Sequence, residues 1–197
     1  MYALIDKEAL DSLGIELLAY CKYLESQNVP IAQYRNKNYL PEVIQQDLIT
    51  IKKNFSGQLV LNDYPQFIEY ADGLHVGQED LAKYGATTAD AFKSLKERLG
   101  SKAVGLSTHN LEEIEVANSI KDLSYIGLGA YRDIMTKKSV FVGGKKLLEI
   151  AKVSIHKVAL IGGVKLDDNF ENSPQISYKV IGSDLMRRYL KHSANKH

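Results

Sequence analysis

The chain has 197 residues, a formal net charge of +1 at pH 7 and one cysteine. So small a net charge gives no electrostatic basis for binding nucleic acid or an anionic membrane, and one cysteine excludes an internal disulfide. No apolar run approaches the roughly 20 residues of a membrane span and no signal peptide is recognisable, so we expect a soluble cytoplasmic protein of one domain.

The first third of the chain alternates short strands with helices. Residues 2–5 form an apolar strand that ends at Asp6. One amphipathic helix follows, on the helical spacing of Leu10, Leu13, Leu17, Cys21 and Leu24. We interpret Cys21 as a small core residue of that helix. Residues 31–34 are strand-like, and Pro41 then begins a helix whose inward face carries Ile44, Leu48 and Ile51.

Two short strands, residues 59–61 and 73–76, are separated by a segment with room for about two helical turns. A strand, a short helix and a second strand make a βαβ unit, so the two strands run parallel. Asp63 and Asp80 follow the two strands closely and can converge on one hard cation, for which magnesium is the first choice. The alternative is that these residues serve only as turn and helix-cap residues.

The remaining elements follow the same alternation. Thr87 and Asp90 form a capping box for a helix that ends at Gly100, and Asn110 caps another. The inward face of that second helix is predicted to carry Leu111, Ile114, Ala117 and Ile120. Strands are predicted at residues 103–106, 125–128, 157–161 and 178–181, and helices at residues 145–153 and 184–191. Residues 165–175 have little apolar periodicity, which indicates a single turn at most.

Eight strands that alternate with helices predict a compact α/β fold, the (β/α)₈ or TIM barrel, over residues 1–191. Polar residues or glycines follow nearly every strand, which a closed barrel explains better than an open sheet with one switch point. The seventh connection is predicted to be shortened. Residues 192–197 are predicted to be a disordered tail.

The predicted strand ends combine cations, hydroxyl groups and glycines that suit a phosphorylated ligand. Glycine turns after the last two strands, followed by a helix N-terminus, form the usual phosphate site of this fold. The side chains and turns concerned are Arg35, Lys37, Lys137, Ser107, Thr136, Gly162, Gly163, Gly182 and Ser183. Each has a plainer interpretation as a solvated strand end, a helix cap or a tight turn, and His75 as a packed core histidine.

Several motifs together resemble the thiamine phosphate synthase family. They are GLHVGQED, LVLND, QYRNK, VGLSTHNLEE, YIGLG with a downstream TKK, and LIGGV. Members of that family join a hydroxymethylpyrimidine diphosphate to a thiazole phosphate and release pyrophosphate. The resemblance therefore implies a magnesium-dependent transferase that binds these two small molecules, in an assembly that can be a homodimer.

The resemblance also implies roles for individual residues. It places magnesium on Asp63 and Asp80. It assigns diphosphate contacts and the main catalytic load to Arg35, Lys37, Ser107 and Lys137, with Asn62 beside them. Substrate contacts fall on Gln33, His75, Thr136 and Gly163. Gly182 and Ser183 are predicted to bind substrate from the glycine turn and the helix N-terminus that follow the last strand, and not from the resemblance.

The chain departs from the family pattern after its sixth strand and at its last one. The loop reads GAYRDIMTK, in which the family's proline pair is missing, Ile134 replaces a threonine, and Arg132 and Asp133 are new charges. The last strand ends VIGSDL. Two alternatives stay open: a thiazole tautomerase-like isomerase, whose catalytic histidine aligns with His109, and a non-catalytic barrel that binds phosphorylated thiamine precursors.

Overall fold

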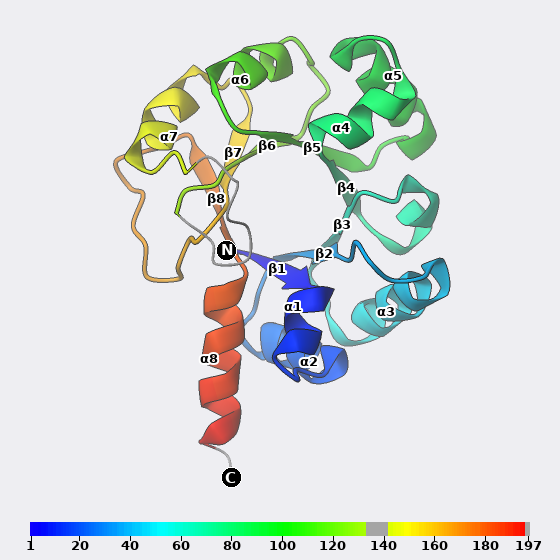
Figure 1. Ribbon diagram of the computed structural model, residues 1–197, viewed down its shortest axis with the longest axis vertical. Coiled ribbons are helices and arrows are strands. Elements are labelled where there is room, and N and C mark those ends of the chain that lie inside the picture. Colours follow the sequence, from blue (N-terminus) through cyan, green and yellow to red (C-terminus); the bar gives the residue numbers. More distant parts are fainter. Residues whose placement is uncertain (133–141, 196–197) are drawn as a thin grey trace.

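The computed structural model describes residues 1–132 and 142–195. Within them, parallel strands close into a barrel in chain order, with helices around the outside (Figure 1). The strands are β1 (Tyr2–Asp6), β2 (Ile31–Arg35), β3 (Gln58–Asn62), β4 (Gly73–Val76), β5 (Ala103–Thr108), β6 (Tyr125–Leu128), β7 (Lys157–Leu160) and β8 (Ile176–Ile181). The predicted (β/α)₈ barrel is confirmed.

The helices follow the strands in alternation. The α-helices are α1 (Lys7–Ser12), α2 (Leu17–Ser26), α3 (Pro41–Asn54), α4 (Gln78–Leu81), α5 (Thr88–Leu99), α6 (Leu111–Asn118), α7 (Lys145–Ile150) and α8 (Ser183–Ala194). Three 3₁₀ helices join them in the described part of the chain: η1 (Pro65–Tyr70), η2 (Ala82–Tyr84) and η3 (Ala151–Val153). None of the described helices is long and apolar enough to cross a membrane.

Both predicted caps are confirmed. The Thr87 side chain accepts a hydrogen bond from the Asp90 N–H at the start of α5, and Asn110 does the same for the Glu113 N–H at the start of α6. These bonds satisfy N–H groups that a helix leaves unpaired at its first turn. Because a cap depends on residues three apart in the chain, local sequence is sufficient to predict it.

Two predicted features are wrong in detail. The first amphipathic helix is two helices, because the chain turns at Gly14 with φ 65°, which leaves Leu13 44% exposed. Leu111 is 40% exposed instead of facing inward. The short helix predicted between β3 and β4 is present as the 3₁₀ helix η1. Each difference arises where a short connection, rather than apolar periodicity, decides the path of the chain.

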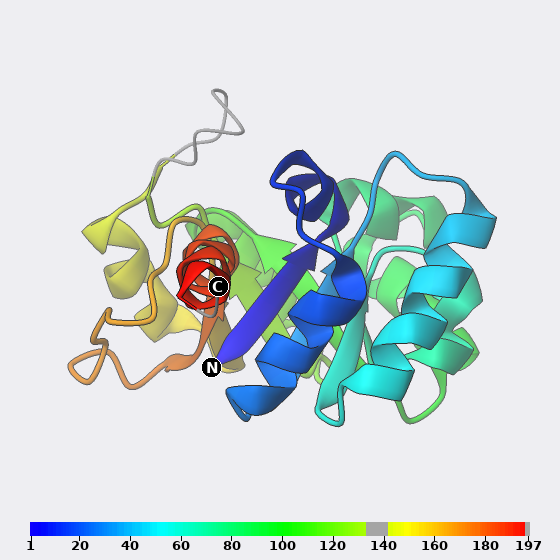
Figure 2. The same ribbon diagram turned by 90° about the horizontal axis from the view of Figure 1, so that it is seen from below.

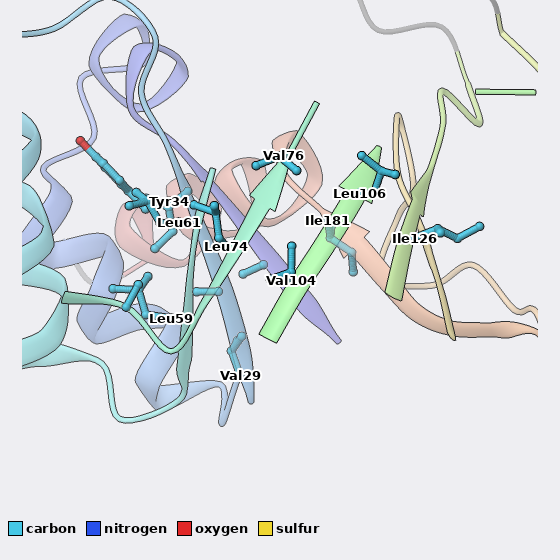
Figure 3. Packing of buried hydrophobic residues seen from close by; sticks show 14 of the residues in the cluster. Val29, Tyr34, Leu59, Leu61, Leu74, Val76, Val104, Leu106, Ile126 and Ile181 are labelled. Carbon is cyan, nitrogen blue, oxygen red and sulfur yellow. The ribbon is translucent and has the colours of Figure 1, made fainter. Parts of the chain in front are cut away.

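Side chains of the strands alternate between two apolar cores. The larger core lies between the barrel and its helices and contains outward-facing residues such as Leu59, Leu74 and Val104 (Figure 3). It also contains Cys21, whose burial raises the pKa of its thiol to about 12 and confirms it as a core residue. The smaller core fills the barrel interior. Its buried members are Tyr2, Val60, Tyr125, Ala159 and Val180.

The seventh connection is short, as predicted. Residues 161–175 contain turns and no helix. Arg132 ties them to the end of β6, with Nη2 of Arg132 2.8 Å from Oδ1 of Asp168 and Nη1 donating to the Gly163 carbonyl at 2.8 Å. The closing helix α8 continues past residue 191 to Ala194, and its Tyr189 ring packs edge-on against Tyr20 of α2, with ring centroids 5.6 Å apart.

Candidate active site

The carboxyl ends of the strands form one rim of the barrel, the rim beyond which α1 (dark blue) lies in Figure 2. At the ends of β3 and β4 this rim holds a cleft of about 280 Å³. Asp63 and Asp80 both line it, together with Lys37, Lys83 and Tyr64. The structure therefore brings together the two aspartates that the sequence pairs, in the company of two cations.

The backbone around Asp63 is held in an unusual conformation. Asp63 and Tyr64 have φ values of 59° and 55°, in the left-handed region that non-glycine residues rarely adopt. The Asp63 N–H donates to the His75 carbonyl at 2.8 Å, and the Asn62 amide donates to the Asp63 carboxylate. Strain of this kind persists where surrounding contacts enforce it, and it concentrates at functional sites.

The Asp63 carboxylate is electrostatically unsatisfied. Burial raises its pKa, and the neighbouring Asp80 carboxylate raises it further. Its Oδ1 is buried and has no hydrogen-bond partner among the described residues. Lys37 lies 3.9 Å from Oδ2, whereas Lys83 sits 2.6 Å from Oδ1 of Asp80. A carboxylate that has one buried oxygen without a partner and is repelled by a second carboxylate is suited to share a cation with it.

The donor set fits magnesium better than a metal held entirely by protein. No group of three or more His, Cys, Asp or Glu side chains in the described ranges is arranged to hold an ion. Mg²⁺ is commonly held by one or two carboxylates and completes its octahedron with water and substrate phosphate oxygens. Asp63 and Asp80 would be those carboxylates.

Asp6 at the end of β1 and Glu8 in α1 contact residues at and just after the end of β2. Arg35 Nη1 donates to Asp6 Oδ2 at 2.7 Å and to Glu8 Oε2 at 3.3 Å. The other Glu8 oxygen accepts from the Lys37 N–H at 2.8 Å. Asp6 also caps α1. Sequence reasoning missed Asp6, Glu8 and Lys83, although Asp6 ends a strand as the predicted site residues do.

Gln33, His75 and Ser107 face the barrel interior. Gln33 is 3% exposed and donates to the Tyr2 hydroxyl at 2.8 Å. Both ring nitrogens of His75 have partners, since Nδ1 lies 3.1 Å from the Tyr125 hydroxyl and Nε2 lies 2.9 Å from Ser107 Oγ. Of the three, Ser107 is the least buried and lies nearest the rim along its strand.

Burial lowers the pKa of His75 from 6.5 to about 4, so the ring is neutral near pH 7. Between these two values the unfolded chain binds a proton that the folded protein does not. We therefore expect the free energy of unfolding to be at its full value above pH 6.5 and to fall as the pH drops to 4, by on the order of 3 kcal/mol from this group.

Urea denaturation across this pH range measures the effect. The variant His75→Asn should have a shallower pH dependence than the parent protein. A pH dependence in His75→Asn equal to that of the parent would exclude His75 as the titrating group.

Arg132 packs against Gly163, one of the glycines predicted to bind substrate phosphate. Gly163 has φ 63°, and a Cβ placed on it would lie 2.7 Å from the Arg132 Cβ, so glycine is needed there for both backbone and space. Gly182 precedes α8 and Ser183 is its first residue, which puts free helix N–H groups at this end. Thr136, Lys137, Asp133 and Ile134 lie outside the described residues.

His109 belongs to a helix cap. Its side chain is 49% exposed, and Nδ1 is 2.9 Å from Oε2 of Glu113, which also accepts from the His109 N–H. Glu113 in turn donates its N–H to the capping Asn110. These contacts place His109 at the start of α6, directed towards that helix.

A closed parallel barrel with paired aspartates and cations in a cleft at its carboxyl-end rim defines a (β/α)₈ protein whose charged cleft lies where this fold usually places its functional site. The chain belongs to the thiamine monophosphate synthase family, whose model matches residues 1–172.

Known proteins agree with this assignment. A thiamine-phosphate synthase of Persephonella marina is 30% identical over 170 residues, which are 83% of this chain and 76% of that protein. One from Lawsonia intracellularis is 32% identical over 146 residues, 71% of this chain and 62% of the relative. The solved thiamine phosphate pyrophosphorylase of Pyrococcus furiosus superposes with a TM-score of 0.68 at 19% identity, over 97% of this chain and 95% of that one, and so supports the fold.

Proposed function

We propose that the protein is a magnesium-dependent thiamine phosphate synthase. It joins a hydroxymethylpyrimidine diphosphate to a thiazole phosphate and releases pyrophosphate. The observation that carries the proposal is the Asp63–Asp80 pair. One buried oxygen of Asp63 has no partner among the described residues, and the carboxylate faces Asp80 in a cleft that also holds cations. The names of the relatives support the same reaction.

In the reaction, the bond between the pyrimidine methylene carbon and the diphosphate oxygen breaks, and the electron pair leaves with the diphosphate. The thiazole nitrogen then uses its lone pair to form the new carbon–nitrogen bond. No proton has to be removed from either substrate in these steps. The main task of the protein is therefore to bind the departing anion and to hold the two substrates in line.

The cationic side chains of the rim perform that task. Arg35 is fixed by Asp6 and Glu8 through one terminal nitrogen, which leaves its other N–H groups for the diphosphate. Lys37 lines the cleft and the Asn62 amide donates to the Asp63 carboxylate, while Ser107 adds a hydroxyl donor from β5. Magnesium between Asp63 and Asp80 would supply further positive charge to the diphosphate oxygens. Lys137 and Thr136 keep their proposed diphosphate and substrate roles on the resemblance alone.

The thiazole phosphate is assigned to the opposite side of the rim. Backbone N–H groups at Gly163, Gly182 and Ser183 are suited to a phosphate, and the N-terminus of α8 adds a favourable dipole. Gln33 and His75 are assigned to the pyrimidine end, at the base of the site. A cytoplasmic location and a homodimeric assembly are further parts of the proposal.

Purified protein with both substrates and magnesium tests the function. Thiamine phosphate is measured by fluorescence after oxidation, and chelation of the metal should abolish its formation. Conversion of a thiazole carboxylate phosphate tautomer without thiamine phosphate would instead identify a tautomerase. Binding of the ligands without either conversion would identify a binding protein.

The variant His109→Ala separates the synthase from the tautomerase. Since His109 is exposed and contacts Glu113 at a helix start, its removal should lower kcat by less than about tenfold, the range expected for a lost cap. Steady-state kinetics with saturating magnesium provide the measurement, and Glu113→Gln is the matched variant of the same cap. An inactive His109→Ala protein beside an active Glu113→Gln protein would indicate proton-transfer chemistry and contradict the proposal.

A further inference from the structure

A continuous row of hydrogen-bonded side chains crosses the barrel interior and ends at Ser107. Gln33 Nε2 donates to the Tyr2 hydroxyl at 2.8 Å, and the hydroxyls of Tyr2 and Tyr125 are 2.9 Å apart. The row continues from Tyr125 to His75 Nδ1 at 3.1 Å and from His75 Nε2 to Ser107 Oγ at 2.9 Å. We call these five residues the interior chain. Neither tyrosine has a role in the site described above.

We infer the direction of the hydrogen bonds in the interior chain from the donors and acceptors that each member offers. A neutral imidazole has one donor nitrogen and one acceptor nitrogen, and each phenol has a single proton to donate. Burial raises the pKa of both Tyr2 and Tyr125, so both hydroxyls keep their protons. Tyr2 accepts from the Gln33 amide, so among the described contacts the Tyr125 hydroxyl is the acceptor left for the Tyr2 proton. With that proton directed at Tyr125, the proton of Tyr125 is left for His75 Nδ1.

His75 links the hydrogen bonds of the interior to Ser107 at the rim. With Nδ1 as the acceptor, Nε2 carries the ring proton and donates it to Ser107 Oγ. The hydroxyl proton of Ser107 is then not used within the chain. In the opposite direction Ser107 would donate to His75, and its oxygen would face an incoming anion without a proton to offer.

We propose that Tyr125, held by Tyr2 and Gln33, is a positioning residue that fixes His75 as the Nε2–H tautomer and so leaves the Ser107 hydroxyl free to donate to an anion at the rim. The identification of this anion as a diphosphate rests on the proposed function. The assignment of the His75 tautomer is independent of that function.

The packing of the interior supports a fixed arrangement. The rings of Tyr125 and His75 are stacked, with centroids 5.5 Å apart and an interplanar angle of 24°. The Tyr178 ring contacts both tyrosines edge-on, with its centroid 6.2 Å from that of Tyr2 and 6.3 Å from that of Tyr125. Rings held on several sides cannot easily turn to reverse the hydrogen bonds. The variant Tyr178→Phe is therefore a matched control, because it removes a hydroxyl from the same aromatic cluster but not from the interior chain.

Nitrogen NMR of protein labelled in its histidine rings measures the tautomer directly, with His75→Gln used to assign the signals. His75 in the parent protein and in Tyr178→Phe should show a protonated Nε2 and an unprotonated Nδ1. In Tyr125→Phe the signals should move towards a mixture of tautomers. A parent protein with a protonated Nδ1, or a Tyr125→Phe protein with unchanged signals, would overturn the inference.

Calorimetric titration with inorganic pyrophosphate and magnesium tests the consequence at the rim. Tyr125→Phe should bind pyrophosphate about tenfold more weakly, the loss expected for one misdirected hydrogen bond, and Tyr178→Phe should bind as the parent does. Equal affinities for the parent and Tyr125→Phe would overturn the role of Ser107. If Tyr125→Phe does not fold by circular dichroism, Tyr2→Phe interrupts the same chain one bond earlier and is measured in its place.

The NMR measurement and the thiamine phosphate assay together distinguish a failure of the positioning role from a failure of the proposed function. If the tautomer shifts as expected but no thiamine phosphate is formed by the parent protein, the proposed function fails and the positioning role of Tyr125 stands. If thiamine phosphate is formed and the tautomer does not respond to Tyr125→Phe, the proposed function stands and the positioning role fails.

Discussion

Asp63→Asn should lower kcat at limiting magnesium by on the order of 10²–10³ and, at the same time, make the metal-free protein harder to unfold by heat. The loss of activity follows because an amide is a far weaker ligand than a carboxylate for a hard cation. The gain in stability follows because the ionised Asp63 is buried and repelled by Asp80, which is also why its pKa is raised. Asparagine in addition tolerates the left-handed backbone at this position.

Activity assays over a range of magnesium concentrations and thermal unfolding with and without the metal provide the measurements. The metal-free midpoint should rise by a few degrees, because 1 kcal/mol corresponds to about 2–4 °C for a chain of this size. Magnesium should raise the midpoint of the parent protein but not that of Asp63→Asn.

Glu79→Gln is the matched control, since Glu79 is an exposed neighbour of Asp80 on α4. It should leave activity and the effect of magnesium unchanged. An Asp63→Asn protein that kept the parent's activity at limiting magnesium would show that the two aspartates do not hold the metal.

Features that depend on near neighbours in the chain could be predicted from the sequence. The caps at Thr87 and Asn110 and the buried face of α3 all depend on residues three or four apart. The meeting of Asp63 and Asp80 also follows from simple topology, because parallel neighbouring strands end at the same rim. The break at Gly14 was missed because apolar residues continue on both sides of it with a spacing close to helical.

Features that depend on distant pairings could not be predicted in the same way. The contact of Arg35 with Asp6 joins residues 29 positions apart, and that of Tyr2 with Tyr125 joins residues 123 apart. No local pattern distinguishes an interior tyrosine that packs from one that also passes on a hydrogen bond. Only the register of the closed barrel sets which inward-facing side chains meet.

The glycines of β5 and β6 show how this register accommodates the interior chain. A Cβ on Gly105 would lie 2.2 Å from Cζ of Tyr125, and one on Gly127 would lie 2.7 Å from Cε1 of His75. Both distances are too short for real atoms. The two glycines therefore provide the space in which a phenol and an imidazole fit inside a narrow barrel.

Gly105→Ala should accordingly be among the most destabilising single-methyl changes in the chain. The added methyl group overlaps the Tyr125 ring, which is buried and packs against Tyr2, His75 and Tyr178. Overpacking of this kind costs about 1–3 kcal/mol and more where neighbours cannot shift, so we expect a loss of about 3 kcal/mol. Urea denaturation of Gly105→Ala, with Gly182→Ala as the control, measures it.

The control is informative because a Cβ on Gly182 would have its nearest neighbour at an ordinary 3.5 Å, on the Leu4 side chain, so that variant should unfold close to the parent. Replacement of the Tyr125 ring by a smaller side chain provides the second test. In the double variant Gly105→Ala with Tyr125→Leu, the new methyl group no longer meets the phenol, so the two changes should destabilise the protein by less than the sum of their separate effects. Strictly additive losses would mean that the methyl group is accommodated by movement of the strands, and that Gly105 is not what makes room for Tyr125.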